Sequence, residues 1–133
     1  MHWREGVTVK LVALILLLAS FTPAWAQQDI AMQVNVGFND YYKVGEWVPV
    51  TVVLENPGGK DIAGELVVEI TESTGDSVYS KPVILPPNSK KKYTLYVLIR
   101  QYKSALKVEL HDGGGRLIAE EEKALRPSTP GIP

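Results

Sequence analysis

The feature that most constrains this chain is a period-two alternation of apolar and polar residues, which begins soon after residue 27. Successive side chains of an extended strand point to opposite faces, so this period is typical of strands that bury one face. The residues predicted to face the interior are Ile30, Met32, Val34, Val36 and Phe38, then Val48, Val50, Val52 and Leu54, then Leu66, Val68 and Ile70, then Tyr93, Leu95, Val97 and Ile99, and then Leu106, Val108 and Leu110.

Turn residues separate these segments at intervals of about a dozen positions. The clearest turns are Asn56-Pro-Gly-Gly-Lys60, Pro86-Pro-Asn-Ser89 and Asp112-Gly-Gly-Gly115, the last of which closes a hairpin. Two weaker, short strands are expected around 78–79 and 83–85, where Pro82 indicates an edge strand or a crossing between sheets.

The fold class that follows is all-β: an antiparallel β-sandwich of seven to eight strands. No segment after residue 26 has a convincing helical period, and nothing between the strands is long enough for the crossover helices of a parallel sheet. Residues 119–125 fit either a short helical turn or an exposed edge strand that is guarded by charges.

The first 26 residues have the layout of a secretory signal peptide. Arg4 and Lys10 precede the apolar run 11–21, and the small-x-small triplet Ala24-Trp-Ala26 follows it. This apolar run has about half of the roughly 20 residues that a membrane-spanning helix requires. The pattern predicts a signal-peptide helix, cleavage after Ala26 and an extracytoplasmic location; an uncleaved membrane anchor is the alternative, because Trp25 is bulky for a cleavage site.

The remaining chain divides into one domain, 27–125, and a proline-rich tail, 126–133, that is typical of an extended linker. Removing the leader takes away two of the 14 basic residues and one of the 15 acidic residues, which leaves a net charge near −2. That charge gives no attraction to nucleic acid or anionic lipid. The chain has no cysteine, so the domain depends on its hydrophobic core alone.

Three segments resemble a known family. They are the strand and turn Trp47-Val-Pro-Val-Thr-Val-Val-Leu-Glu-Asn-Pro-Gly58, the glycine-led strand that begins at Gly64, and the segment Leu85-Pro-Pro-Asn-Ser89 before the next strand. Together they resemble bacterial Ig-like domains of the cell-adhesion-related and alpha-galactosidase-associated types. The opening Val34 to Val50 is similar to the first domain of exported, membrane-anchored bacterial proteins. The resemblance implies a scaffold or adhesion role and no catalytic residues.

Residues for catalysis or metal binding are scarce. His111 is the only histidine after the leader, and its neighbour Asp112 points to the opposite face of the strand, so the two are not expected to pair. A surface histidine, no enzyme activity and no cofactor are therefore predicted. Asp112 with Asp40 or Asp61 has the oxygen ligands for calcium, although a turn is the favoured interpretation.

Two runs of charged residues could each bind a ligand or be ordinary surface residues. Residues 120–122, all glutamates, are expected to be a solvated run and not a ligand cluster. The lysines Lys90 to Lys92 suit either an anionic cell-wall polymer or the guarded start of a strand, and the second is favoured.

The aromatic residues are the candidate ligand or interface residues: Tyr41, Tyr42, Trp47, Tyr96 and Tyr102. The competing interpretation, which we favour from the sequence, is that Trp47 and one tyrosine cap the core and that a tyrosine hydroxyl bonds to the backbone. Three apolar residues, Val53, Val67 and Leu98, fall on faces expected to be polar, which suggests that another domain or a second copy covers an outer face.

The sequence therefore predicts an exported, non-catalytic Ig-like module for protein interaction, adhesion or spacing at the cell surface. Two alternatives stay open: a module that binds carbohydrate or cell-wall polymer, and an accessory domain of a larger extracytoplasmic enzyme. The partner is a protein or a cell-wall polymer, with self-association as a further option. Contact with a membrane is expected only if the leader is retained.

Overall fold

The structure is a computed structural model that describes residues 29–102 and 105–127. The predicted leader, 1–26, lies outside the described residues. Within the described part all regular structure is β-strand and none is helix. The strands are β1 (Ala31–Val36), β2 (Tyr41–Tyr42), β3 (Trp47–Asn56), β4 (Ile62–Thr71), β5 (Ser77–Leu85), β6 (Ser89–Leu98), β7 (Ala105–Asp112), β8 (Leu117–Lys123) and β9 (Arg126–Pro127).

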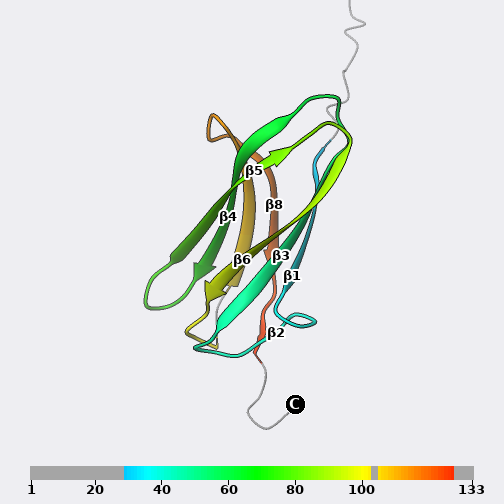
Figure 1. The fold of residues 1–133 in the computed structure, drawn as a ribbon. Coiled ribbons are helices and arrows are strands. Elements are labelled where there is room, and N and C mark those ends of the chain that lie inside the picture. The colour runs from blue at the N-terminus through cyan, green and yellow to red at the C-terminus, as the bar shows by residue number, and fades with distance from the viewer. Residues whose placement is uncertain (1–28, 103–104, 128–133) are drawn as a thin grey trace, which may run out of the picture.

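Two antiparallel sheets account for the seven longer strands. A three-stranded sheet has the order β1-β3-β6, and a four-stranded sheet has the order β5-β4-β7-β8. Figure 1 shows the two sheets in a sandwich-like arrangement, with the strands along the long axis of the molecule. The short strands β2 and β9 pair in parallel at one end. The predicted all-β, antiparallel class is confirmed.

The core lies between the two sheets and consists of the inward residues of each alternating strand. In β3, for example, Val48, Val50, Val52 and Leu54 are buried. Each such side chain contributes about 1.5–3 kcal/mol through removal from water. Among the described residues, every strand and every buried core residue lies within 30–127.

The inward alternation of β1 ends at Val36, and the prediction that Phe38 faces the interior is wrong. Gly37 has a φ of +59°, and the next residues form a tight hairpin in which Asn39 and Asp40 have φ values of +54° and +66°. Two successive positive φ values are the mark of a type I′ turn. This turn carries Phe38 out of the core, and its side chain is 82% exposed.

The two short strands expected at 78–79 and 83–85 are one continuous strand, β5. Pro82 is tolerated because β5 lies at the edge of its sheet, as the proline indicated. The glutamate run lies in the edge strand β8, so the edge-strand interpretation of 119–125 is confirmed. Arg126 and Pro127, the start of the predicted tail, pair with β2.

Side-chain hydrogen bonds join the edge strands β5 and β6 where the two sheets meet. The backbone N–H of Leu98 donates to the hydroxyl of Tyr79 at 3.1 Å, and the hydroxyl of Tyr93 donates to the carbonyl of Ile84 at 3.0 Å. The ammonium group of Lys81 is 3.4 Å from the carbonyl of Thr94. These contacts protect an edge that is otherwise open to pairing with another chain.

A candidate interaction surface at the aromatic end

Exposed aromatic side chains gather at one end of the molecule, the end at which β2 and β9 lie in Figure 1. We call this surface the aromatic end. The described part of the ribbon begins at the opposite end, next to the start of β1. Among the described residues the aromatic end contains every aromatic side chain of high exposure: Phe38 (82%), Trp47 (63%), Tyr96 (63%), Tyr102 (60%) and Tyr41 (49%).

Trp47 points away from the core because it precedes Val48, which points inward. The interpretation in which Trp47 caps the core is therefore wrong. Trp47 pairs with Leu98, and Pro49 pairs with Tyr96, on the outer face of the three-stranded sheet. The Trp47 ring meets the Tyr79 ring edge to face, with centroids 6.3 Å apart and an interplanar angle of 83°. This contact holds the indole in place without burying it.

The hairpin that carries Phe38 and Tyr41 is closed by two backbone hydrogen bonds. The N–H of Phe38 donates to the carbonyl of Tyr41 at 3.2 Å, and the N–H of Tyr41 donates to the carbonyl of Phe38 at 3.0 Å. The Asp40 carboxylate accepts a hydrogen bond from the Val36 N–H at 3.4 Å and lies 3.5 Å from the Lys123 ammonium group. Phe38 is thus presented on a short hairpin that is tied to β1 and β8.

The segment after β6, which carries Tyr102, is held by Glu72. This carboxylate is buried, and its Oε1 accepts hydrogen bonds from the N–H of Arg100 at 2.6 Å and of Gln101 at 3.2 Å. The Gln101 side chain in turn accepts hydrogen bonds from the N–H and the hydroxyl of Ser73, both at 2.9 Å. The loops after β4 and β6 are therefore fastened to each other, although 28 residues separate Glu72 from Arg100.

Tyr42 is the one candidate aromatic that belongs to the core, where it is 3% exposed. Its hydroxyl donates to the carbonyl of Gln101 at 3.4 Å, which is the backbone contact that the sequence suggested for one tyrosine. Burial raises the pKa of Tyr42, and the negative charge of Glu72 adds to the rise. Of the five predicted residues the structure thus brings four together on the aromatic end. The sequence missed Phe38, and the tight-turn dipeptide Asn39-Asp40 was the signal that indicated its position.

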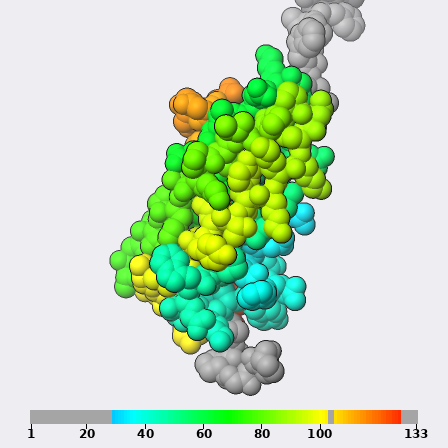
Figure 2. Space-filling view, in the orientation of Figure 1, coloured from blue at the N-terminus to red at the C-terminus, as the bar shows by residue number. Residues whose placement is uncertain are grey.

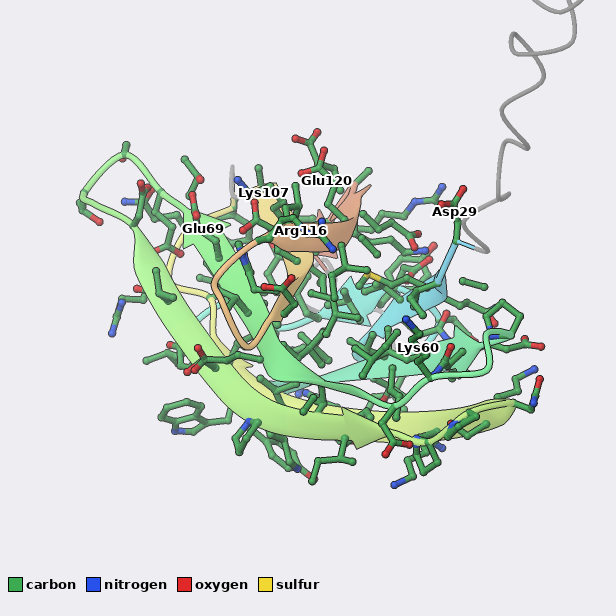
Figure 3. The ribbon with its side chains drawn as sticks, turned by 90° about the horizontal axis from the view of Figure 1, so that it is seen from above. Asp29, Lys60, Glu69, Lys107, Arg116 and Glu120 are labelled. Atoms are coloured by element: carbon green, nitrogen blue, oxygen red, sulfur yellow. The ribbon has the colours of Figure 1, made fainter. Side chains whose placement is uncertain are left out.

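His111 belongs to a charged cluster on the outer face of the four-stranded sheet. Its Nε2 lies 2.8 Å from Glu109 Oε2 and its Nδ1 lies 3.2 Å from the carbonyl of Gly115. Lys107 lies 3.0 Å from Glu109 and 3.9 Å from Glu69. Figure 3 shows Lys107, Glu69 and Glu120 on this side of the molecule. Glu109, and not Asp112, contacts the imidazole, so His111 belongs to an ion-pair network.

The network predicts that the protein loses stability as the pH rises from about 6.5, the ordinary pKa of histidine. The hydrogen bond with Glu109 and that with the Gly115 carbonyl raise the pKa of His111 above its ordinary value, about 6.5. A raised folded-state pKa stabilises the protein fully below the unfolded value, and this contribution is lost as the pH rises through the folded value. Thermal unfolding measured from acidic to alkaline pH is expected to show this decline. The variant His111→Gln is expected to have a flatter profile, and an unchanged decline in the variant would contradict the assignment.

The aspartates proposed for calcium do not converge. Asp40 lies in the hairpin of the aromatic end, whereas Asp61 and Asp112 line a hollow of about 920 Å³ at the opposite end. Asp112 Oδ1 accepts hydrogen bonds from the N–H groups of Gly114 and Arg116, and the second of these is the main cause that lowers the pKa of Asp112. Within residues 29–102 and 105–127, no group of three or more His, Cys, Asp or Glu side chains is placed to hold a metal ion.

The same hollow is lined by charged residues and by one buried polar residue. Asp29, Lys60 and Arg116, which Figure 3 labels, are among its lining residues. The side-chain amide of the buried Asn56 also lines it, but this amide donates to the carbonyls of Lys60, Leu85 and Pro86. Asn56 therefore serves the turn that follows β3.

In the part of the chain that the structure describes, no helix has the length and apolar character needed to cross a membrane.

Comparison with solved structures shows a likeness in fold. A structure described as Northeast Structural Genomics Consortium target SoR45 has a TM-score of 0.52 and 15% identity, and the match covers 78% of this chain and 89% of that one. The Pseudomonas fluorescens alkylpurine DNA glycosylase AlkC, bound to DNA with an abasic site analogue, has a TM-score of 0.52 and 17% identity. That match covers 74% of this chain but only 30% of the glycosylase, and at such identity both likenesses concern the fold alone.

No curated protein matches the chain in sequence. The family described as Domain of unknown function (DUF8726) matches residues 29–126, which include eight complete strands and the first residue of β9. Because this match covers most of the chain, the protein belongs to the DUF8726 family.

Proposed function

We propose that this protein is an exported, non-catalytic Ig-like module that binds a partner protein through its aromatic end. The layout of the first 26 residues supports export. Two antiparallel sheets around one core support the Ig-like assignment.

One observation carries the proposal: the exposed aromatic side chains lie together at one end. Single exposed apolar residues are normal on a soluble protein, but a cluster of them marks an interaction site. Tyrosine, tryptophan and phenylalanine are enriched at protein interfaces because each offers a large contact area with few rotatable bonds. In sandwich domains of the immunoglobulin type, loops at one end form such binding surfaces.

The anchoring of these loops favours tight binding. The Phe38 hairpin is closed on itself, and the Tyr102 segment is fastened by Glu72. Residues that are already ordered lose less conformational entropy on association. A surface of this kind is suited to bind as a rigid body, with Phe38 or Trp47 as the anchor that enters a pocket of the partner.

A carbohydrate ligand is the alternative that one observation favours. Trp47 and Tyr96 share an outer sheet face with the hydroxyls of Thr51 and Thr94, and stacking rings beside hydroxyls suit a glycan. The exposed Phe38 has no polar group and lies in a hairpin outside this face. A protein partner can contact both the sheet-face aromatics and the exposed Phe38 of the hairpin. A glycan on the sheet face would contact only Trp47 and Tyr96.

The test uses residues 27–133, immobilised and offered the extracytoplasmic proteins of the source cell, the same material after protease digestion, and insoluble cell-wall polysaccharide. The variant Phe38→Ser/Trp47→Ala/Tyr96→Ala is expected to bind its protein partner at least about tenfold more weakly, because hot-spot aromatics dominate binding energy. The control variant Ile84→Ala/Leu117→Ala removes exposed apolar side chains outside the aromatic end and is expected to bind normally.

Equal binding by the triple variant and the wild type would contradict the proposal. Binding that survives protease digestion, or that is found on the polysaccharide, and that depends on Trp47 and Tyr96 would replace it by the glycan alternative. Circular dichroism of each variant checks that the sheets are intact.

A further inference from the structure

The outer face of the three-stranded sheet has aromatics at one end and lysines at the other. Its central cross-strand pair is Thr51 with Thr94. Figure 2 shows the start of β3 (teal) and the end of β6 (yellow) together on the surface near the aromatic end. The outward pairs, taken in order along the strands, are Trp47 with Leu98, Pro49 with Tyr96, Thr51 with Thr94, Val53 with Lys92, and Glu55 with Lys90.

On β3 and β6 this face is only weakly suited to water, whereas its β1 residues Gln33 and Asn35 are polar and exposed. Pro49, Val53 and Leu98 are half-buried apolar residues on the outer side of the sheet. On β3 and β6 its charges are confined to one end, where Lys90 lies 4.0 Å from Glu55 and where Lys92 is exposed. An antiparallel sheet with one solvated face ordinarily carries polar residues throughout that face.

We infer that a second copy of this chain docks on this face, with the strands of the two copies antiparallel. The inference rests on the proposed function, because it takes Trp47 and Tyr96 as binding residues, and it names their partner. The twofold axis lies between the two faces, parallel to the sheets and perpendicular to the strands, at the level of Thr51 and Thr94. Rotation about this axis places the second face on the first with its strands running in the opposite direction. Tyr96 and Lys92 are each two residues from Thr94, so the axis brings Tyr96 of one copy opposite Lys92 of the other.

The same axis brings Trp47 opposite the Glu55–Lys90 pair, because residues 47 and 55 are each four positions from Thr51. An ammonium group over a tyrosine or tryptophan ring is attracted by the charge distribution of the ring. Each copy supplies both the cations and the rings, so the contact forms twice. Such a self-complementary patch is what a twofold dimer requires.

The size of the face sets the strength of this contact. Strands of six, ten and ten residues, at about 3.4 Å per residue and a spacing of about 4.8 Å, give a face of roughly 400 Å² per copy. Stable interfaces bury about 800 Å² per partner, so the dimer is weak and reversible. It forms where copies are concentrated, as they are when many chains are held at one surface.

The experiment is sedimentation velocity of residues 27–133 alone, over a rising series of protein concentrations, with three variants. Trp47→Ala/Tyr96→Ala removes the rings, Lys90→Glu/Lys92→Glu reverses the cations, and Ile84→Ala is the control. The wild type and the control are expected to dimerise reversibly. Each double variant alone is expected to associate at least tenfold more weakly, because it lacks both contacts.

A mixture of the two double variants is the decisive sample. The lysines of the ring-less copy meet the rings of the charge-reversed copy, so one of the two contacts is intact and the mixture associates more strongly than either variant alone. No recovery in the mixture would overturn the antiparallel arrangement. A wild type that stays monomeric throughout the series would overturn the second copy as partner, while the binding test with digested and undigested cell protein would still decide the proposed function.

Discussion

Glu72→Ala is expected to lower the free energy of unfolding by about 2–4 kcal/mol, because it removes a charged acceptor from two backbone N–H groups. The carboxylate is 6% exposed, so the N–H groups of Arg100 and Gln101 lose a partner in a site that water reaches poorly. The loop that carries Tyr102 is expected to loosen at the same time. Urea unfolding gives the free energy, and amide hydrogen exchange at Arg100 and Gln101 reports the loop.

Two control variants test whether the effect comes from the hydrogen bonds of Glu72 and not from the loss of a negative charge. Glu72→Gln keeps an oxygen acceptor without the charge and is expected to cost less than Glu72→Ala. Glu46→Ala removes an exposed carboxylate from a neighbouring loop and is expected to change the free energy of unfolding by less than about 0.5 kcal/mol. A cost for Glu72→Ala as small as that for Glu46→Ala would show that the buried carboxylate does not hold the loop.

Gly37→Ala is the second substitution with a large expected effect, about 2–4 kcal/mol of destabilisation from a left-handed backbone and a steric clash together. Gly37 has a φ of +59°, and a methyl group built on it would lie 2.1 Å from the carbonyl oxygen of Tyr41. That oxygen is part of the hairpin backbone, so relief of the clash must displace the hairpin. We expect both a lower melting temperature and weaker partner binding, because Phe38 and Tyr41 move.

Gly45→Ala is the matched control for this substitution. Gly45 also has a positive φ, +83°, but a methyl group on it would meet nothing within 4 Å. It therefore shows the backbone cost alone, about 1–2 kcal/mol. If Gly37→Ala costs no more than Gly45→Ala, the close approach of the hairpin to Gly37 has no energetic consequence and the account of the Phe38 hairpin is wrong.

The core could be predicted from the sequence because a strand has only two faces. Once Val48, Val50 and Val52 are assigned to the interior, the position of each neighbour follows. The outward position of Trp47 was implied by the same parity. The size and apolar character of the indole led to the interpretation that it caps the core, although burial depends on the face that the strand presents and not on hydrophobicity alone.

The alternating pattern could not predict the exposure of Phe38 or the burial of Glu72. The pattern continues through Phe38, but positive φ values at Gly37, Asn39 and Asp40 turn the backbone, and a period-two count does not contain that turn. Glu72 shows a second limit. A glutamate that follows a strand is typically solvated, and its burial results from loops that meet only after folding. Tertiary contacts, and not local propensity, therefore fix how the aromatic end is held.

The most direct test of the central claim uses the fluorescence of Trp47, which is the only tryptophan after residue 26. In dilute solution of residues 27–133 the account predicts emission typical of a solvated indole and ready quenching by acrylamide, because the side chain is 63% exposed. Addition of the bound partner should shift the emission to shorter wavelength and reduce the quenching. A Trp47 that is already shielded in the dilute protein, or one that is equally quenched with and without partner, would contradict the claim that the aromatic end is the binding surface.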